Sequence, residues 1–272
     1  NKRFGSWRSV FVCIVGCIAV FLIGLSACQQ GGEVVVIDDD DIGGVVSGPD
    51  GPEAGVWVIA ETTDLPTKFS RTVVTDDQGS YVVPDLPDAT YDVWVRGYGL
   101  VDSEKIRLRP GTTQDLQAVL APDEHTAAQY YPAGYWFSLI EVPAKSEFPG
   151  TGPGGNGILP TMRSQAEWLR NLKSGGCMAC HQLGNKPTRE VPAALGEFAS
   201  MEEAWDRRIR SGQAGGSMYG GLNRMGLSAA LEMFADWTDR IVAGELPPAP
   251  PRPAGVERNV VITQWDWADP TT

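Results

Sequence analysis

Positive charge is scarce in this chain. Its 22 lysines and arginines are outnumbered by 34 aspartates and glutamates, which gives a formal net charge of −12 at pH 7 and a sequence pI near 4.6. A surface of this sign repels the phosphates of nucleic acids. We therefore expect no nucleic-acid partner. We interpret the acidic surplus as a contribution to solubility that also favours encounters with basic proteins at low salt.

Long apolar runs are also scarce. The one pronounced stretch, Val10 to Leu25, is shorter than the roughly 20 residues of a membrane-spanning helix. Lys2, Arg3 and Arg8 precede it, and this order is typical of an export signal, with an uncleaved membrane anchor as the alternative. Because the chain begins with Asn rather than Met, we expect at least one residue to precede it.

The apolar stretch ends in Leu25-Ser26-Ala27-Cys28, which resembles the lipobox of bacterial lipoproteins. The resemblance implies that residues 1–28 are a lipoprotein signal peptide and that Cys28 is acylated as the mature N-terminus. The protein would then be held in the cell envelope by its lipid. Gln29 follows the cysteine where an aspartate would retain an enterobacterial lipoprotein at the inner membrane. This favours the periplasmic side of the outer membrane.

Cysteine and histidine are few, with five and two copies respectively. Cys13 and Cys17 lie within the predicted signal, so the mature chain keeps Cys28, Cys177 and Cys180. With Cys28 assigned to the lipid and the other two assigned below, no cysteine remains for a disulfide.

Cys177-Met178-Ala179-Cys180-His181 is a Cys-x-x-Cys-His run, which is typical of the attachment site of a c-type haem. The two thiols form thioethers with the haem vinyl groups, and the adjacent imidazole becomes an axial iron ligand. The sequence therefore predicts one covalent haem c on Cys177 and Cys180, with His181 as the proximal ligand. Since this haem is attached outside the bacterial cytoplasm, the motif agrees with the export signal.

Two other uses of these cysteines are open to the sequence. A structural zinc site needs four ligands, and the mature chain offers Cys177, Cys180, His181 and His125, two of them adjacent. A redox-active dithiol of the thioredoxin type needs a βαβ context, which the surrounding sequence does not predict. The export signal and the helical surroundings favour haem.

Residues 29–41 are predicted to be an acidic tether, because two glycines are followed by the run Asp38 to Asp41. Residues 42–122 predict an all-β sandwich, since short strand patterns alternate with turn signals. Alternation puts Tyr91, Val93 and Val95 on one face. The turn 76–79 predicts a hairpin. The expected strands are 45–46, 55–60, 72–75, 81–83, 91–95, 105–108 and 115–120.

Four motifs in this region resemble the carboxypeptidase regulatory-like domain. They are Gly43-Gly44-Val45-Val46, Gly55-Val56-Trp57-Val58, Thr75-Asp76-Asp77-Gln78-Gly79-Ser80-Tyr81 and Leu86-Pro87-Asp88-Ala89-Thr90-Tyr91, with Ala89 at a position that is usually glycine. The resemblance implies a seven-stranded prealbumin-like sandwich that is not catalytic and serves in scaffolding or adhesion. Glycan binding is an alternative role for its aromatic side chains, which more commonly pack in the core. The aromatics concerned are Trp57, Tyr81, Tyr91 and Trp94.

Residues 123–160 are predicted to connect two domains. The first part contains His125 and several aromatic residues, and we expect it to be a short ordered piece that packs against a domain. Residues 141–160 are rich in glycine and proline, which predicts a linker or an extended loop. The aromatic residues are Tyr130, Tyr131, Tyr135, Trp136 and Phe137.

Residues 161–246 are predicted to be an all-α domain that carries the haem. Capping-box patterns at Ser164 and Ser200 begin two helices, and a third is expected from Ser228 to Ala243. Buried stripes are expected at Met201, Trp205 and Ile209 and, in the last helix, at Leu231, Phe234, Ala235, Thr238, Ile241 and Val242. The helices and the haem motif together resemble class I cytochrome c domains, in which the first helix packs across the last.

The resemblance also implies a distal methionine supplied by a loop. Met218 follows the glycine-rich segment 211–217, where a loop would allow close approach of the backbone to a flat macrocycle. Met225, in a similar segment, is the second candidate, and a histidine or an open position is the third. Met201 and Met233 are expected in helix cores.

Three further roles are assigned around the iron. By the same resemblance, the carbonyl of Pro192, or failing that of Pro187, accepts a hydrogen bond from the ring of His181. His125 is expected on the surface, because a second histidine ligand would require the connector to fold back. Three arginines are candidates for pairing with haem propionates, or else form a solvated helix face: Arg207, Arg208 and Arg210.

These features predict a lipid-anchored c-type cytochrome that passes single electrons between redox proteins of the envelope and has no catalytic residue of its own. The alternative is an envelope binding or adhesion module, or a fragment of a larger enzyme in which the haem is a relay or sensor. Residues 247–272 motivate the alternative. Their proline-rich start predicts a stiff linker, and Arg258 to Trp267 predicts a strand that opens a further β domain.

Overall fold

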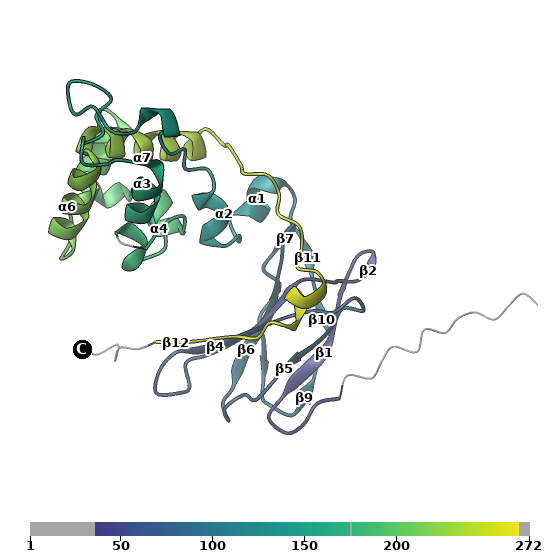
Figure 1. Ribbon diagram of the computed structural model, residues 1–272. Helices are drawn as coiled ribbons and strands as arrows, with labels where there is room; N and C mark the ends of the chain where they lie inside the picture. The colour runs from purple at the N-terminus through teal and green to yellow at the C-terminus, as the bar shows by residue number, and fades with distance from the viewer. Residues whose placement is uncertain (1–35, 175, 267–272) are drawn as a thin grey trace, which may run out of the picture. The chain divides into compact units, whose positions relative to one another are not determined.

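The computed structural model describes residues 36–174 and 176–266 (Figure 1). The predicted signal peptide, Cys28 and most of the acidic tether lie outside the described residues. Within the two described ranges, none of the helices has the length and apolar composition needed to cross a membrane.

The first sheet of the N-terminal domain is built around β1 (Ile42–Gly48). This strand pairs antiparallel with β2 (Gly51–Pro52) and β5 (Ser80–Val83), and parallel with β9 (Thr112–Thr113) and β10 (Leu116–Gln117). The parallel partners come from the end of the domain, so β1 joins its first and last segments.

The second sheet has the order β12-β4-β3-β6-β8. Its strands are β3 (Trp57–Thr62), β4 (Phe69–Val74), β6 (Tyr91–Arg96), β8 (Ile106–Leu108) and β12 (Ile262–Trp265), and all neighbours are antiparallel. The two sheets enclose an apolar core and form a β-sandwich-like domain, which confirms the predicted fold class of this region.

The core of the sandwich follows the predicted alternation. Tyr91, Val93 and Val95 are all fully buried, and the expected strands are present except that 115–120 is divided into two short strands in different sheets. The hydroxyl of Tyr81 donates to the Gln114 carbonyl at 2.7 Å. Three of the four aromatic side chains considered for sugar stacking, Tyr81, Tyr91 and Trp94, are buried. A two-stranded ribbon of β7 (Leu100–Val101) and β11 (Val119–Leu120) completes the domain.

The segment 76–79 forms a turn but not a hairpin. Gly79 has a φ of +74°, and its N–H donates to the Asp76 carbonyl at 3.2 Å. The flanking strands β4 and β5 belong to different sheets, however, so the turn crosses from one sheet to the other. The hairpin prediction was wrong because a local turn signal does not specify which strands pair.

The acidic run ends within the sandwich. The Leu86 N–H donates to the Asp40 carbonyl at 2.8 Å, and the Gly111 N–H donates to the Asp41 carbonyl at 2.7 Å. The prediction of a solvated tether was therefore wrong for these last two residues. Their side chains carry the charge that suggested a tether, but their backbone groups belong to the fold.

The C-terminal strand returns to the sandwich. β12 pairs with β4, and Arg71 Nε donates to Thr263 Oγ1 at 3.1 Å, across 192 residues of sequence. A short 3₁₀ helix, η4 (Gly255–Asn259), precedes the strand, and Arg258 forms an ion pair with Asp77. The predicted strand is present but shorter, since Arg258 and Asn259 belong to η4. Its assignment to a further β domain was wrong, because local pattern does not reveal a distant sheet edge.

The helical domain begins in the predicted connector, not at residue 161. It includes α1 (Glu124–Ala128), α2 (Ala133–Phe137) and η1 (Lys145–Glu147). As expected, the aromatic piece packs against a domain, since Tyr135 and Trp136 join the same apolar core as the later helices.

Residues 141–160 are a packed loop and not a linker. Ile158 is 1% exposed, and the Gly152 N–H donates to its carbonyl at 2.8 Å. Phe148 packs edge-on against Trp168. The linker prediction was wrong because composition records the glycines and prolines of this segment but not the two apolar side chains that anchor it.

The three predicted helices are present as α3 (Gln165–Leu172), α5 (Met201–Ile209) and α7 (Leu227–Val242). Ser164 and Ser200 cap the first two, each accepting a backbone N–H three residues later. Trp205 and Ile209 are buried as expected, whereas Val242 is 73% exposed, because the buried face of α7 turns toward Met233 and Trp237. Short elements α4 (Lys186–Arg189), η2 (Cys177–Ala179) and η3 (Ala193–Leu195) lie between them.

A fourth helix, α6 (Gly215–Met225), lies where the sequence predicted loops. Each interior glycine destabilises a helix by about 0.5–1 kcal/mol relative to alanine, and α6 has three, Gly216, Gly220 and Gly221, besides Gly215 at its first position. Burial offsets this, because Leu222 and Met225 are 2% and 1% exposed and α6 packs against α5 and α7. The spacing of Met218, Leu222 and Met225 at i, i+4 and i+7 is the signal that predicts it.

We expect a fragment of residues 123–253 to unfold in a cooperative transition and a shorter fragment of residues 161–253 not to do so. The shorter fragment loses the buried side chains of Tyr135, Trp136, Leu139 and Ile158. At about 1.5–3 kcal/mol each, their burial matches the whole stability of a typical domain, about 5–15 kcal/mol. Thermal unfolding of both fragments, purified from the same host and followed by circular dichroism, checks this. If both fragments unfold equally cooperatively, residues 123–160 do not belong to the core.

Candidate functional site

The residues predicted to hold the haem and its iron line one cavity of the helical domain. Cys177, Cys180, His181 and Met218 all border a space of about 280 Å³, near the lower end of the range of about 300–1,000 Å³ for small-molecule sites. The deep wall is apolar and consists of Leu183, Trp205, Ile209, Leu222 and Phe234. The rim consists of Gly176, Ala179, Ala214, Ser217, Gly221 and Arg224.

The cysteine motif is held against the end of α3. The η2 turn begins after Gly176, where a side chain would meet the Asn171 carbonyl oxygen at 2.0 Å. The Ala179 N–H donates to the Gly176 carbonyl at 3.1 Å. Cys177 is half-buried, whereas Cys180 and His181 are exposed. Both thiols are free, so each is available for a covalent bond.

The two thiols differ in their electrostatic environment. Burial raises the pKa of the Cys177 thiol, because the apolar surroundings disfavour the thiolate. Cys180 borders the same cavity and is exposed. Folding therefore lowers the fraction of reactive thiolate at Cys177 at a given pH.

Helix α6 supplies the rim opposite the cysteines. Ser217, Met218, Gly221, Leu222 and Arg224 line the cavity, and their spacing puts them on one side of the helix. Met218 is therefore positioned by a helix, not by the loop that the class I resemblance implies. The loop expectation was wrong because Gly215 and Gly216 of that segment begin a packed helix, and only Gly212 lies in the turn before it.

The other methionines lie elsewhere. All six methionines of the chain are among the described residues, and of these Met218 alone lines the cavity. Met225, the second candidate, is 1% exposed in the core at the end of α6. Met233 is also in the core, as expected, where its sulfur accepts the Trp168 indole N–H at 3.4 Å. Met201 is half-buried at the start of α5.

The floor of the cavity is an aromatic stack. The rings of Trp205 in α5 and Phe234 in α7 are 4.7 Å apart at an angle of 22°. Trp205 Nε1 donates to Thr238 Oγ1 at 2.9 Å, so its polar group is satisfied away from the cavity. Two helices thus each supply an aromatic side chain to the cavity lining, and the Arg208 guanidinium lies over the Trp205 ring at 4.9 Å from its centroid.

Several predicted residues do not lie at the cavity. The Pro192 carbonyl accepts the Leu195 N–H at 2.9 Å, and neither Pro192 nor Pro187 is among the lining residues. His125 is exposed on α1, with its ring beside Gly244, as expected of a surface histidine.

The three candidate propionate partners have other contacts. Arg208 donates to the Glu190 carbonyl, and Arg210 forms a bidentate pair with Asp206 at 2.8 Å. Arg207 contacts Ser211. None of the three lines the cavity.

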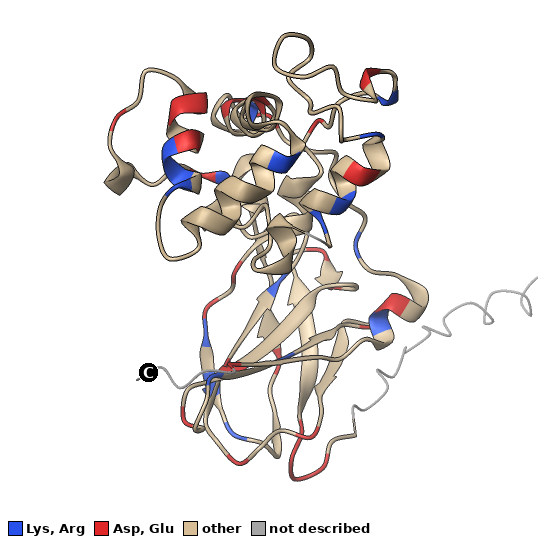
Figure 2. Cartoon of the chain, turned by 60° about the vertical axis from the view of Figure 1, so that its left-hand side comes forward, with Lys and Arg blue, Asp and Glu red and all other residues tan. Residues whose placement is uncertain are grey.

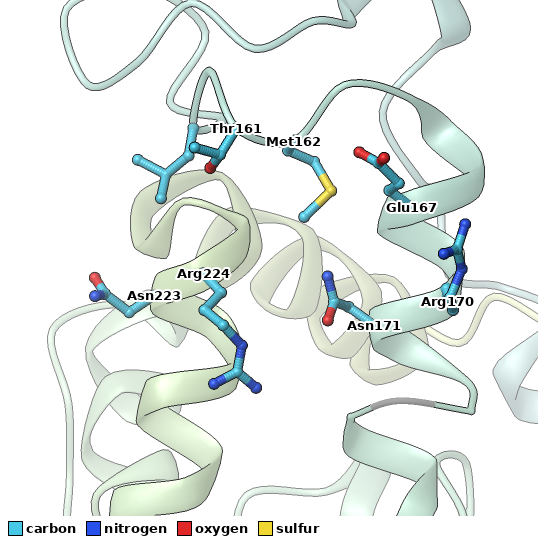
Figure 3. Close-up of a pocket in the computed structure, with 8 residues that line it drawn as sticks. Thr161, Met162, Glu167, Arg170, Asn171, Asn223 and Arg224 are labelled. Atoms are coloured by element: carbon cyan, nitrogen blue, oxygen red, sulfur yellow. The ribbon is translucent and has the colours of Figure 1, made fainter.

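A second cavity of about 520 Å³ lies beside the first, between α3 and α6 (Figure 3). Its polar lining consists of Glu167, Arg170, Asn171, Asn223 and Arg224. Arg224 borders both cavities. The sequence analysis did not single out this residue. Ser217, Gly221 and Arg224 are spaced at i, i+4 and i+7, and this spacing places Arg224 on the cavity side of α6.

The structure does not assemble the zinc site that the sequence left open. Within the described ranges, one group of three His, Cys, Asp or Glu residues has its ligand atoms within 4.8 Å of one another. It is Asp38, Asp40 and Asp41, before β1. His125 is not near the cysteine cavity. The cysteines also lie among helices, not in a βαβ unit.

The charge of the chain is unevenly distributed. Residues 161–246 contain ten basic and ten acidic residues, so the acidic surplus comes from other parts of the chain. Figure 2 shows acidic residues along the loops of the sandwich, whereas the helices carry both signs. The net charge of −12 therefore does not describe the surface around the cysteine cavity.

Comparison with known families finds the carboxypeptidase regulatory-like domain at residues 41–121. The match agrees with the motif resemblance and with the sandwich of the structure. It covers the β domain and none of the helices around the cysteine cavity. No curated protein matches the chain.

We expect Cys177 to react with iodoacetamide more slowly than Cys180 in haem-free protein. Burial raises the pKa of the Cys177 thiol and limits access to it, whereas Cys180 is exposed. Labelling of Cys177 should become faster as the pH rises. Mass spectrometry of protein starting at Gln29, made without c-type maturation, measures both rates. Denatured protein is the control, and faster labelling of Cys177 in the folded state would contradict the prediction.

Proposed function

We propose that this chain is a c-type cytochrome that carries single electrons in the cell envelope. The observation that carries the proposal is the meeting of Cys177, Cys180, His181 and Met218 at one apolar cavity. The two thiols, the imidazole and the thioether are the donor set of a covalent haem with His/Met ligation. Met218 lies about 40 residues after the motif, so sequence proximity alone does not account for this meeting.

The cavity residues fit a flat, largely apolar group. Trp205 and Phe234 supply a stacked aromatic floor, and Gly221 leaves the opposite rim without a side chain. Both cysteines are free for thioether formation. Two open thiols beside an apolar space are chemically suited to a porphyrin with two vinyl groups.

Each residue has a distinct task in this proposal. Cys177 and Cys180 keep the group on the chain, His181 donates an imidazole nitrogen, and Met218 donates a soft sulfur that favours the reduced state. When bound, the haem supplies one-electron chemistry through its iron. The apolar wall excludes water from that centre, which also supports a raised potential.

The cavity is better suited to a carrier than to a catalyst. Among its lining residues, all in the described part of the chain, none is Asp or Glu, and the charged side chain is Arg224. A general acid–base mechanism would need a titratable group in reach of a substrate. The titratable residues in its lining, Cys177, Cys180 and His181, are all assigned to the haem.

The cellular setting is also part of the proposal. The lipobox-like segment supports export and lipid attachment through Cys28, on the periplasmic side of the outer membrane, with envelope redox proteins as partners. The sandwich would serve as a spacer or docking module. The alternative, a binding module or a fragment of a larger enzyme, was suggested by the strand near the end of the chain. This strand pairs with β4, so it no longer supports that alternative.

A pyridine haemochrome spectrum tests the proposal. The chain from Gln29 onward is exported in a host with c-type maturation, together with a known cytochrome as the maturation control. A c-type spectrum that remains with the chain under denaturing conditions is expected, and replacement of both Cys177 and Cys180 with alanine should abolish it. Colourless protein alongside a matured control would remove the electron-transfer proposal.

We expect the Met218→Leu variant to lose the charge-transfer band from methionine sulfur to ferric iron and to have a lower reduction potential. Loss of the soft axial ligand removes its preference for the reduced state. Met225→Leu is the matched control, because Met225 is on the same helix but lies in the core. If the band is unchanged in Met218→Leu and lost in Met225→Leu, Met225 and not Met218 is the iron ligand.

A further inference from the structure

We infer that α6 forms the distal wall of the haem site through Gly221 and Arg224 as well as Met218. The bare backbone at Gly221 contacts the face of the macrocycle, and the guanidinium of Arg224 pairs with a propionate. This inference rests on the proposed haem binding. It departs from the expected class I arrangement, because a helix and not a loop forms this wall.

The first argument is that the protein itself does not require glycine at position 221. A Cβ placed there would meet only the Arg224 guanidinium, at 4.0 Å, which is ordinary contact. The backbone is helical, so no positive φ demands glycine. Gly215, in the same helix, differs, because a Cβ there would lie 2.8 Å from the backbone of Arg210.

The second argument is the position of Gly221. It borders the cysteine cavity one helical turn after Met218, on the side that also carries Leu222. A side chain here would border the cavity that Cys177, His181 and Met218 also line. Glycine at a helix face is suited to close approach of a ligand to the backbone. A large flat ring beside the Met218 sulfur is such a ligand.

The third argument is the free guanidinium of Arg224. Among the described residues, no hydrogen bond or ion pair is formed by its side chain, whereas Arg208 and Arg210 are engaged. Its terminal nitrogens lie over Gly220 and Gly221, 3.9 and 4.0 Å from where a Cβ at each glycine would be. Arginine matches a carboxylate with two parallel hydrogen bonds.

The second cavity gives a carboxylate room beside that guanidinium. Arg224 and Asn171 extend from α6 and α3 into the space between the two helices (Figure 3). Arg170, Asn223 and Glu167 also line it, so two cations and two amides share this solvent-open space with one carboxylate. A propionate that leaves the apolar cavity at Arg224 would enter this polar one and keep its charge hydrated.

The test of Gly221 uses Gly216 as its control. A Cβ at Gly216 meets nothing within 4 Å, and Gly216 does not line the cavity. Neither Gly216→Ala nor Gly221→Ala should lower the unfolding temperature of the haem-free protein, because alanine favours a helix. In the matured protein, Gly221→Ala should weaken the methionine charge-transfer band, Gly221→Leu should weaken it further, and Gly216→Ala should leave it intact.

The test of Arg224 is the pH dependence of the reduction potential. An adjacent guanidinium lowers the pKa of a carboxyl group, so Arg224→Gln should raise the propionate pKa. The reduction potential changes with pH around the propionate pKa, and this change should then occur at a pH higher by about one unit or more. Arg207→Gln is the matched control, because Arg207 contacts Ser211 and lies outside both cavities.

The outcomes separate this inference from the function beneath it. Wild-type protein without covalent haem would overturn the proposed function. If the protein carries haem but the charge-transfer band of Gly221→Leu equals that of Gly216→Ala, the role of Gly221 is overturned. If the pH profile of the potential is the same in Arg224→Gln as in Arg207→Gln, the role of Arg224 is overturned. A weakened band together with a shifted profile would support both assignments.

Discussion

The helical domain depends on the stacking of Trp205 against Phe234. This contact joins α5 to α7, and it forms both part of the domain core and the floor of the cysteine cavity. Trp237 lies beside the pair, and its indole donates to the Trp136 carbonyl at 2.9 Å, which ties the connector to the same core. The cavity therefore has one wall in the apolar core and opens at the surface beside Cys180 and His181.

The arrangement explains how a chain with few ligand residues can present a site. The η2 turn holds the thiols and the imidazole at one side, where close contact with α3 requires Gly176. Helix α6 supplies the sulfur and the guanidinium at the other side. Helix α6 packs through Leu222 and Met225, and Leu222 also lines the cavity, so core and site share one side of this helix. Gly221, unlike Gly215, is not needed for internal packing.

The two domains are connected twice along the chain. The chain passes from β11 into α1, and after α7 it returns through residues 247–261 to add β12 to the sandwich. Arg252 forms an ion pair with Glu53 on the way back. The sandwich is consequently not a detachable N-terminal module, since an edge strand of one sheet follows the helical domain in sequence. This favours a scaffold role for the sandwich beside the electron carrier we propose.

Local chemistry determined much of what the sequence could predict. Strand alternation, serine caps and the cysteine motif depend on neighbouring residues, and the strands, α3, α5 and α7 follow from them. Tertiary contacts decided the rest. Burial of Leu222 and Met225 stabilises a helix in a glycine-rich segment, and burial of Ile158 packs the segment that was predicted to be a linker. The strand β12 pairs with the distant edge strand β4. The meeting of Met218 and Arg224 with the cysteines also required the fold, because it depends on how α6 packs.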